Sequence, residues 1–256
     1  MFKPIWFTDI DSTIILNSKD TKYLDESKYR CVSYKCGKPS GFMSVQNFNL
    51  LQEIQKRCMV VPVTSRCLSS YMDIHLGFTP ELALIENGAI LLDGYTVSKT
   101  WINESEKLLE PYMDDYSKIR EYLISRGYTE KWGSTYLLDF HTRSEKSEIE
   151  RMEIQEHLSK YEGIQSFVGK SSVIVTHTMN RKEFNIGRLV KYIKICPKRK
   201  IIISGDSQAD WGMLAMTTHS YGLDDSPAYN KFNKEEFDEH LENFLDWVMY
   251  SVYCKT

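Results

Sequence analysis

Short apolar runs alternate with helical patterns along most of this chain. Such runs predict buried strands that end at Phe7 and that span residues 60–63, 82–85 and 201–203. Residues 45–57 repeat apolar positions at helical spacing, behind Ser44, which favours the start of a helix. A strand, a helix and a further strand in this order predict a βαβ unit and an α/β protein with a parallel sheet.

The pattern changes between residues 99 and 178. It predicts a helix, a strand, a second helix and two strands over residues 104–126, 135–141, 144–161, 165–168 and 172–177. This order breaks the βα alternation and predicts an inserted α+β domain over 99–178, with residues 1–98 and 179–256 forming the core. We expect the insertion to cover the sheet edge where open α/β sheets place their ligands.

Four other segments complete the expected organisation. Residues 17–40 are polar and lack helical periodicity, which indicates a long excursion near the active site, and a flap is one interpretation of it. A helix is expected over 68–76, and Asp93-Gly94 indicates a hairpin turn. The apolar positions of 234–252 predict a last helix packed on the core.

Charge and composition exclude some classes of function. The chain has 256 residues, 42% of them hydrophobic, and a net charge of −3, so we expect a sizeable core and no nucleic-acid partner. The one short basic run, Lys198-Arg199-Lys200, is interpreted as a solvated loop. No apolar stretch is long enough to cross a bilayer, and no cleavable leader is recognised before the first strand. We therefore expect no membrane association and a cytoplasmic location.

The six cysteines include no Cys-x-x-Cys pair, so neither a zinc site nor a redox motif is predicted. Reduced thiols are expected. Cys67 stands three residues after Thr64, which places it either at the border of a site or in a buried helix.

Two carboxylates stand one residue apart where the first strand ends, in the run Asp9-Ile10-Asp11-Ser12-Thr13. Side chains alternate in a strand, so Asp9 and Asp11 point to the same side. Both stay ionised only beside a cation or hydrogen-bond donors. Magnesium prefers such oxygen ligands, and an aspartate can accept a phosphoryl group. The other interpretation of this run is a turn that caps a helix.

Three further strand ends or helix starts carry chemically suitable residues. Thr64 follows the run at 60–63 and, with backbone N–H groups at a helix start, can hold phosphate oxygens. Lys182 opens a predicted helix, and its ammonium can offset negative charge. Asp206 and Asp210 follow the run at 201–203.

Each of these features alone is also explained as an N-cap, a solvated lysine or a turn. Together, an acid, a hydroxyl, an amine and a second acid have the composition of a phosphoryl-transfer site. The joint interpretation is the one we adopt.

The motifs resemble the four motifs of the haloacid dehalogenase (HAD) superfamily of phosphohydrolases. The residues that carry the resemblance are Asp9-Ile10-Asp11-Ser12-Thr13, Thr64, Lys182 and Gly205-Asp206-Ser207 with Asp210. The run Glu86-Asn87-Gly88-Ala89 is similar to a signature of the sugar-phosphatase-like subfamily, which carries a C2-type cap between its second and third motifs. The resemblance implies a Rossmann-like (HAD-like) parallel sheet core with an inserted α+β cap domain.

The resemblance also implies roles for these residues. Asp9 would be the nucleophile that forms an aspartyl phosphate, and Asp11 the acid and base. Thr64 and Lys182 would bind the phosphoryl group. The ligands of Mg²⁺ would be Asp9, the main-chain carbonyl of Asp11 and Asp206. Asp210 would complete the metal site by orienting the groups around the ion.

Contacts to the substrate are expected from Ser65, Arg66, Asn87 and Arg143. Arg143 follows the strand that ends at His141 and is also explained as a surface residue. The chain departs from the family pattern at three positions: Ser12 and Ser65 replace glycines, and Ala209 replaces a frequent asparagine before Asp210. The last change removes a polar group near the metal or its waters.

These residues predict a Mg²⁺-dependent phosphatase that hydrolyses the phosphomonoester of a small metabolite, a sugar or sugar-acid phosphate. A phosphosugar mutase on the same scaffold is an alternative. A receiver-like phospho-signalling protein is another, although a receiver carries its acidic pair and its phosphorylated aspartate on different strands. A catalytically silent binding protein is disfavoured, because every reacting position carries a competent residue. The oligomeric state stays open.

Overall fold

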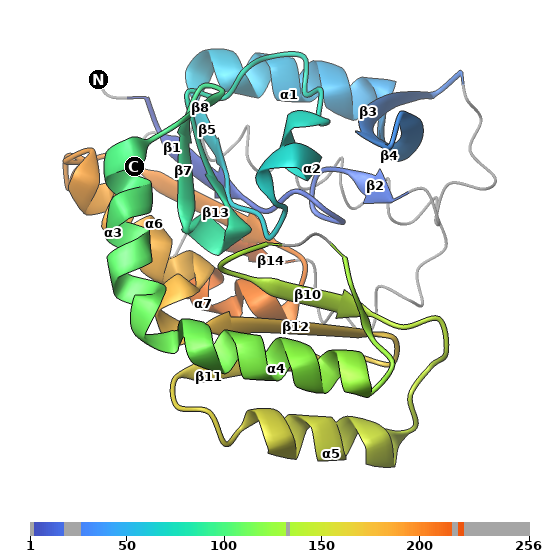
Figure 1. Ribbon diagram of the computed structural model, residues 1–256. Coiled ribbons are helices and arrows are strands. Elements are labelled where there is room, and N and C mark those ends of the chain that lie inside the picture. The colour runs from blue at the N-terminus through green and yellow to red at the C-terminus, as the bar shows by residue number, and fades with distance from the viewer. Residues whose placement is uncertain (1–2, 18–26, 132–133, 217–219, 223–256) are drawn as a thin grey trace.

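The computed structural model describes residues 3–17, 27–131, 134–216 and 220–222 (Figure 1). The helix predicted over 234–252 and part of the excursion predicted over 17–40 lie outside the described residues. Within the described ranges, no helix combines the length and the apolar character needed to span a membrane.

The central sheet is parallel and has the strand order β14-β13-β1-β5. Its strands are β1 (Ile5–Thr8), β5 (Met59–Pro62), β13 (Ile201–Gly205) and β14 (Ser220–Gly222). Thr8 lies beside Pro62 on one side and Ser204 on the other, so three strands end at the same level. The residues that follow these strands therefore meet at one edge of the sheet. This is the α/β class predicted from the sequence.

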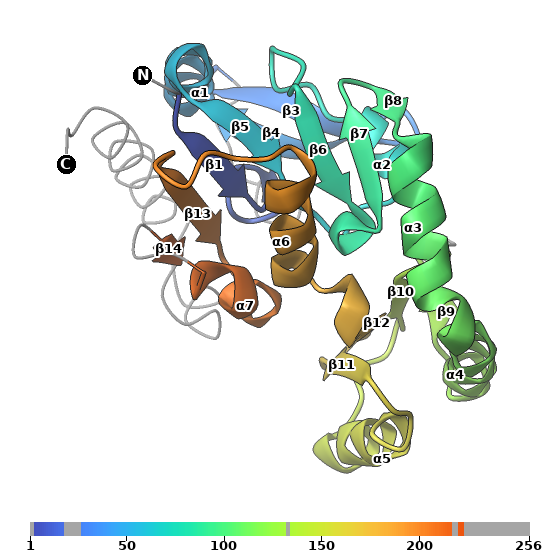
Figure 2. The same ribbon diagram turned by 90° about the vertical axis from the view of Figure 1, so that its left-hand side faces the viewer.

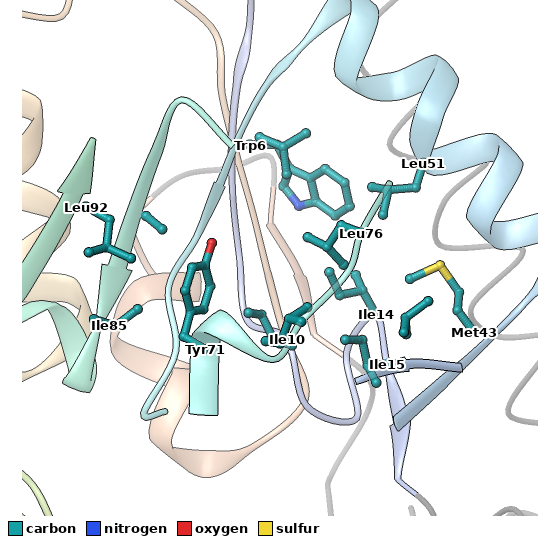
Figure 3. Close-up of a cluster of buried hydrophobic side chains, with 14 of the residues drawn as sticks. Trp6, Ile10, Ile14, Ile15, Met43, Leu51, Tyr71, Leu76, Ile85 and Leu92 are labelled. Atoms are coloured by element: carbon teal, nitrogen blue, oxygen red, sulfur yellow. The ribbon is translucent and has the colours of Figure 1, made fainter. Parts of the chain in front are cut away.

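Helices cover both faces of the central sheet. Helix α1 (Val45–Arg57) begins where predicted, with the Ser44 hydroxyl accepting a hydrogen bond from the backbone N–H of Asn47. On this side Trp6 belongs to a large buried apolar cluster that also contains Ile10, Leu51 and Tyr71 (Figure 3). The other face packs against α6 (Lys182–Tyr192) and α7 (Trp211–Leu214) through a second cluster.

Two smaller antiparallel sheets extend the core. One contains β6 (Leu82–Ile85), β7 (Ile90–Asp93) and β8 (Thr96–Val97), which confirms the predicted strand and hairpin. The other contains β2 (Leu16–Asn17), β3 (Tyr29–Lys35) and β4 (Lys38–Ser44). The described part of the 17–40 excursion is thus mostly the β3–β4 hairpin.

The inserted α+β unit has its own antiparallel sheet, with the order β11-β12-β10-β9. Its strands are β9 (Thr129–Glu130), β10 (Leu138–His141), β11 (Ile164–Val168) and β12 (Ser172–His177). Helices α4 (Met113–Ser125) and α5 (Glu148–Leu158) pack on one face through a separate apolar cluster. Figure 2 shows β11 and β12 below α6 and to the side of α7 of the core. The boundaries predicted at 98/99 and 178/179 stay a prediction.

Several predicted helices and strands have different bounds in the structure. The single helix expected over 104–126 was wrong: α3 (Lys99–Leu109) and α4 are separated by the 3₁₀ turn η2 (Glu110–Tyr112), because Pro111 cannot donate the helical hydrogen bond. Helix α5 begins after Ser147, which forms a capping box with Glu150.

The remaining differences are shorter elements. The strand expected over 135–141 has only the four residues of β10. The helix expected over 68–76 is α2 (Leu68–Met72) and ends early, because the chain after it pairs with β3 through a bridge between Ser33 and Ile74.

Candidate active site

Asp9 follows β1 and is 6% exposed. Its Oδ1 accepts a hydrogen bond from Nζ of Lys182 at 2.6 Å, and the same ammonium donates to Oδ1 of Asp210 at 2.6 Å. Lys182 is the first residue of α6 and is 5% exposed. One buried ammonium therefore bridges two carboxylates that come from different strand ends.

Asp206 completes the acidic group at this edge. Carboxylate oxygens of Asp9, Asp206 and Asp210 lie within 4.8 Å of one another. The hydroxyl of Thr13 lies 3.0 Å from Oδ1 of Asp206 and 3.4 Å from Oδ2 of Asp9, so it joins the two carboxylates. Asp210 is fixed by Ser207, whose backbone N–H and hydroxyl donate to its Oδ2 at 3.0 and 2.7 Å.

Burial changes the proton affinity of these groups. Burial, together with the charges of Asp210 and Asp11, raises the pKa of Asp9 to about 7, even though Lys182 opposes the shift. Burial and the carboxylates of Asp9 and Asp210 raise the pKa of Asp206 to about 8. Burial disfavours the ammonium of Lys182, but Asp210 and Asp9 outweigh it and raise the pKa of Lys182. A single ammonium does not balance three clustered carboxylates.

The donor set suits a hard divalent cation. Oxygens of three carboxylates lie within 4.8 Å of one another, and burial together with repulsion between the carboxylates raises the pKa of two of them. The side chain of Asp11 is not part of this cluster. Its expected contribution is the main-chain carbonyl, which stays a prediction.

Thr64 lies one residue beyond Val63, which is bridged to Leu84. Its side chain is buried, and its hydroxyl accepts a hydrogen bond from the backbone N–H of Arg66 at 3.2 Å. The carbonyl of Thr64 accepts from the backbone N–H of Asn87 at 2.9 Å, which ties the second motif to the Asn-Gly run.

The Asn-Gly run has a backbone that few other residues would adopt. Asn87 has a φ of 59°, in the left-handed region, and its carbonyl accepts from the side-chain amide of Asn185 at 3.0 Å. Gly88 has a φ of 100°, and a Cβ there would lie 2.4 Å from Cβ of Asn185. A close approach between this turn and α6 therefore explains the glycine.

Arg66 binds Asp11 instead of facing open space. Its Nε and Nη2 donate to the two carboxylate oxygens of Asp11 at 2.8 and 2.7 Å, and Nη1 donates to the hydroxyl of Ser33 and the carbonyl of Ser70. This two-point pairing fixes the direction of the Asp11 carboxylate. A role of Arg66 in substrate binding stays a prediction. The structure shows a different contact, in which Arg66 orients the carboxylate of Asp11.

A cavity of about 180 Å³ opens beside Lys182, between the core and the inserted sheet. Asn87 and Ala209 line it, and the substrate contact expected from Asn87 stays a prediction. Ser65 is half-buried next to Thr64. Arg143 is exposed in the loop after β10 and does not line this cavity, so its predicted contact has no support from this arrangement.

Sequence reasoning missed several residues of the site. Thr13 and Ser207 donate hydrogen bonds to the carboxylates. Thr13 stands four residues after Asp9 and Ser207 three before Asp210, and this spacing is the only sign of their role in the sequence. Phe167 and Trp211 line the cavity. For Phe167 the sign in the sequence is its place in an alternating strand, and for Trp211 it is its position directly after Asp210.

The metal-free protein is expected to lose stability as the pH rises from about 4 to about 8. Asp9 and Asp206 have a pKa of 3.8 as model carboxyls but about 7 and about 8 here. The folded state therefore holds more protons than the unfolded chain in this window, and raising the pH favours unfolding. Calorimetric Tm values in chelator measure the effect. Asp206→Asn should make the decrease of Tm with pH shallower. A wild-type Tm that rises with pH over this range would contradict the raised pKa values of Asp9 and Asp206.

No family model matches the sequence, and no curated protein is similar to it at the sequence level. Solved structures do resemble it. The sucrose-phosphatase of Synechocystis sp. PCC6803, solved with sucrose and phosphate, is 12% identical over 96% of this chain and 98% of its own, with a TM-score of 0.61.

Two further structures agree with it. A trehalose-6-phosphate phosphatase related protein is 13% identical over 96% of this chain and 99% of its own, with a TM-score of 0.57. A HAD/COF-like protein from Plasmodium vivax is 14% identical over 96% and 95%, with a TM-score of 0.61. At these identities the likeness concerns the fold, and the chain has the HAD fold with an inserted α+β unit.

Proposed function

We propose that this protein is a Mg²⁺-dependent phosphatase that hydrolyses the phosphomonoester of a small metabolite, a sugar or sugar-acid phosphate. The observation that carries the proposal is the buried group at the sheet edge, in which Lys182 bridges Asp9 and Asp210 beside Asp206. The HAD fold supports it, as do the names of the structures it resembles, which include a sucrose-phosphatase.

In the proposed reaction a carboxylate oxygen of Asp9 attacks the phosphorus, and the bond from phosphorus to the substrate oxygen breaks. Asp11, which enters this step as the carboxylic acid, gives its proton to that oxygen, which leaves as an alcohol. Asp11 then takes a proton from water, whose oxygen attacks the aspartyl phosphate. Phosphate is released and the Asp9 carboxylate is restored.

The surrounding residues hold the reacting groups. Lys182 and the hydroxyl of Thr64 bind oxygens of the phosphoryl group and neutralise its charge. Arg66 keeps the Asp11 carboxylate oriented through its two hydrogen bonds. The chain would hold Mg²⁺ with Asp9, Asp206, Asp210 and the Asp11 carbonyl, and the ion would supply positive charge to the phosphoryl oxygens.

A cytoplasmic location is part of the proposal. The five cysteines within the described residues are free thiols, which suits a reducing compartment.

Purified protein should release phosphate from phosphorylated sugars and sugar acids when Mg²⁺ is present and not when it is chelated. Phosphate release and sugar isomers are measured in the same reactions. Formation of an isomeric sugar phosphate without phosphate release would favour the mutase. No phosphate from any compound, including the reactive acetyl phosphate, would contradict the proposal.

A further inference from the structure

The cavity beside Lys182 has one wall from the inserted sheet and one from the core. Gln165, Phe167 and Thr176 come from β11 and β12, and Trp211 from the start of α7. Figure 2 shows these strands below α6 and to the side of α7. The cavity is therefore next to Lys182, which we propose binds the phosphoryl group, and is placed to receive the rest of a substrate.

Strand alternation explains which residues face the cavity. In β11, Gln165 and Phe167 line it, whereas Ser166 between them receives a hydrogen bond from Gln155 of α5 at 3.0 Å. Gln165 is paired with Thr176 of β12, so both side chains stand on the same face. The insertion thus presents one aromatic ring and two polar side chains to the site.

The core wall contributes a second aromatic ring. Trp211 lines the cavity and is 57% exposed, directly after the buried Asp210. Its indole is therefore available to a ligand. A sugar ring carries C–H groups on its faces and hydroxyls around its edge, and it suits a cavity with aromatic rings on two walls and polar groups between them.

The charges of the cavity match a neutral leaving group. Among the described residues that line it, both cations already bind carboxylates: Lys182 binds Asp9 and Asp210, and Nε of Arg181 lies 3.0 Å from Oε1 of Glu183. Each of these cations faces at least one carboxylate, so the described lining has no excess of positive charge to attract a second phosphate or a carboxylate on the substrate. A polyol would find a donor and an acceptor in the amide of Gln165 and further acceptors in Glu183 and in the Thr176 hydroxyl, whose proton goes to the carbonyl of Asn180 at 3.1 Å.

The size of the cavity limits the leaving group further. Its volume of about 180 Å³ is below the roughly 300–1,000 Å³ of pockets that hold drug-sized ligands. One six-carbon sugar fits this scale better than a disaccharide or a nucleoside.

We infer that this cavity binds the leaving group of the substrate as one neutral monosaccharide ring, held between Phe167 and Trp211. Gln165, Thr176 and Glu183 hydrogen-bond its hydroxyls. The inference rests on the proposed phosphatase function and selects neutral hexose phosphates from the wider class of sugar and sugar-acid phosphates.

Steady-state kinetics test the inference on six probes: glucose 6-phosphate, mannose 6-phosphate, a hexose bisphosphate, a disaccharide phosphate, a nucleoside monophosphate and acetyl phosphate, which has no ring. A hexose phosphate is expected to give the highest kcat/KM. Phe167→Ala and Trp211→Ala should each lower kcat/KM for it by about 10- to 100-fold, at least tenfold more than for acetyl phosphate. Trp211→Phe keeps a ring and should recover most of the loss.

Two matched controls separate a lost contact from a general disturbance. Ser166→Ala lies on the opposite face of β11, and Tyr95→Ala removes another aromatic side chain, 54% exposed on the core. Neither variant should change kcat/KM for the hexose phosphate or for acetyl phosphate.

Three results would overturn the inference while the phosphatase itself stands: a disaccharide phosphate or nucleotide as best substrate, a bisphosphate preferred over the hexose monophosphate, or equal losses on hexose phosphate and acetyl phosphate. If no probe releases phosphate, acetyl phosphate included, the proposed function and this inference are overturned together.

Discussion

Asp9→Asn is expected to abolish turnover while leaving the protein folded. The change keeps the volume of the side chain but removes the nucleophilic oxygen, so no aspartyl phosphate forms, and a loss of at least about 10⁴-fold in kcat is expected. Removing a buried carboxylate with a pKa of about 7 also reduces the repulsion on Asp206. At about pH 8.5 in chelator, the variant should therefore melt no lower than the wild type.

Acid-quenched reactions with a radiolabelled substrate measure the covalent step. The wild type should carry label on protein and Asp9→Asn should carry none. Asp93→Asn is the matched control, because Asp93 is an exposed carboxylate at the end of β7 and should affect neither turnover nor Tm. Turnover of Asp9→Asn near the wild-type rate would remove Asp9 from the mechanism.

The sheet and the motif residues on it could be predicted because they follow local rules. The apolar runs predict β5, β6 and β13. Polar residues that follow neighbouring parallel strands meet at the edge of the sheet where those strands end. The structure brings Asp9, Lys182, Asp206 and Asp210 together there. Their catalytic and metal-binding roles stay a prediction.

Contacts between the core and the insertion could not be predicted, because they depend on how two units with separate apolar clusters face each other. The hydroxyl of Ser134 donates to the buried carboxylate of Glu86, beside Asn87, and the side-chain amide of Asn180 donates to the carbonyl of Tyr136 at 2.9 Å. None of these residues carries a periodic signal. Arg66 shows the same limit, since its pairing with Asp11 joins residues 55 positions apart.

Lys182→Met is expected to lower kcat/KM by about 10²- to 10³-fold, the usual cost of losing one group that stabilises charge in the transition state. Methionine keeps an unbranched side chain in the buried position but leaves Asp9 and Asp210 without their shared donor. In chelator, the carboxylates then lose the ammonium that lowers the pKa of both Asp9 and Asp206. The pKa of both carboxyls should therefore rise further, and the decrease of Tm with rising pH should continue to higher pH than in the wild type.

Lys191→Met is the matched control, because Lys191 is exposed on the same helix α6 and should affect neither measurement. The paired readout distinguishes two ways in which Lys182 can act. A lysine that only binds the phosphoryl group would change kcat/KM and leave the pH dependence of Tm in chelator as it is. A lysine that also balances the buried carboxylates, as its 2.6 Å contacts to Asp9 and Asp210 indicate, changes both. Wild-type kinetics together with a wild-type Tm profile would contradict either role.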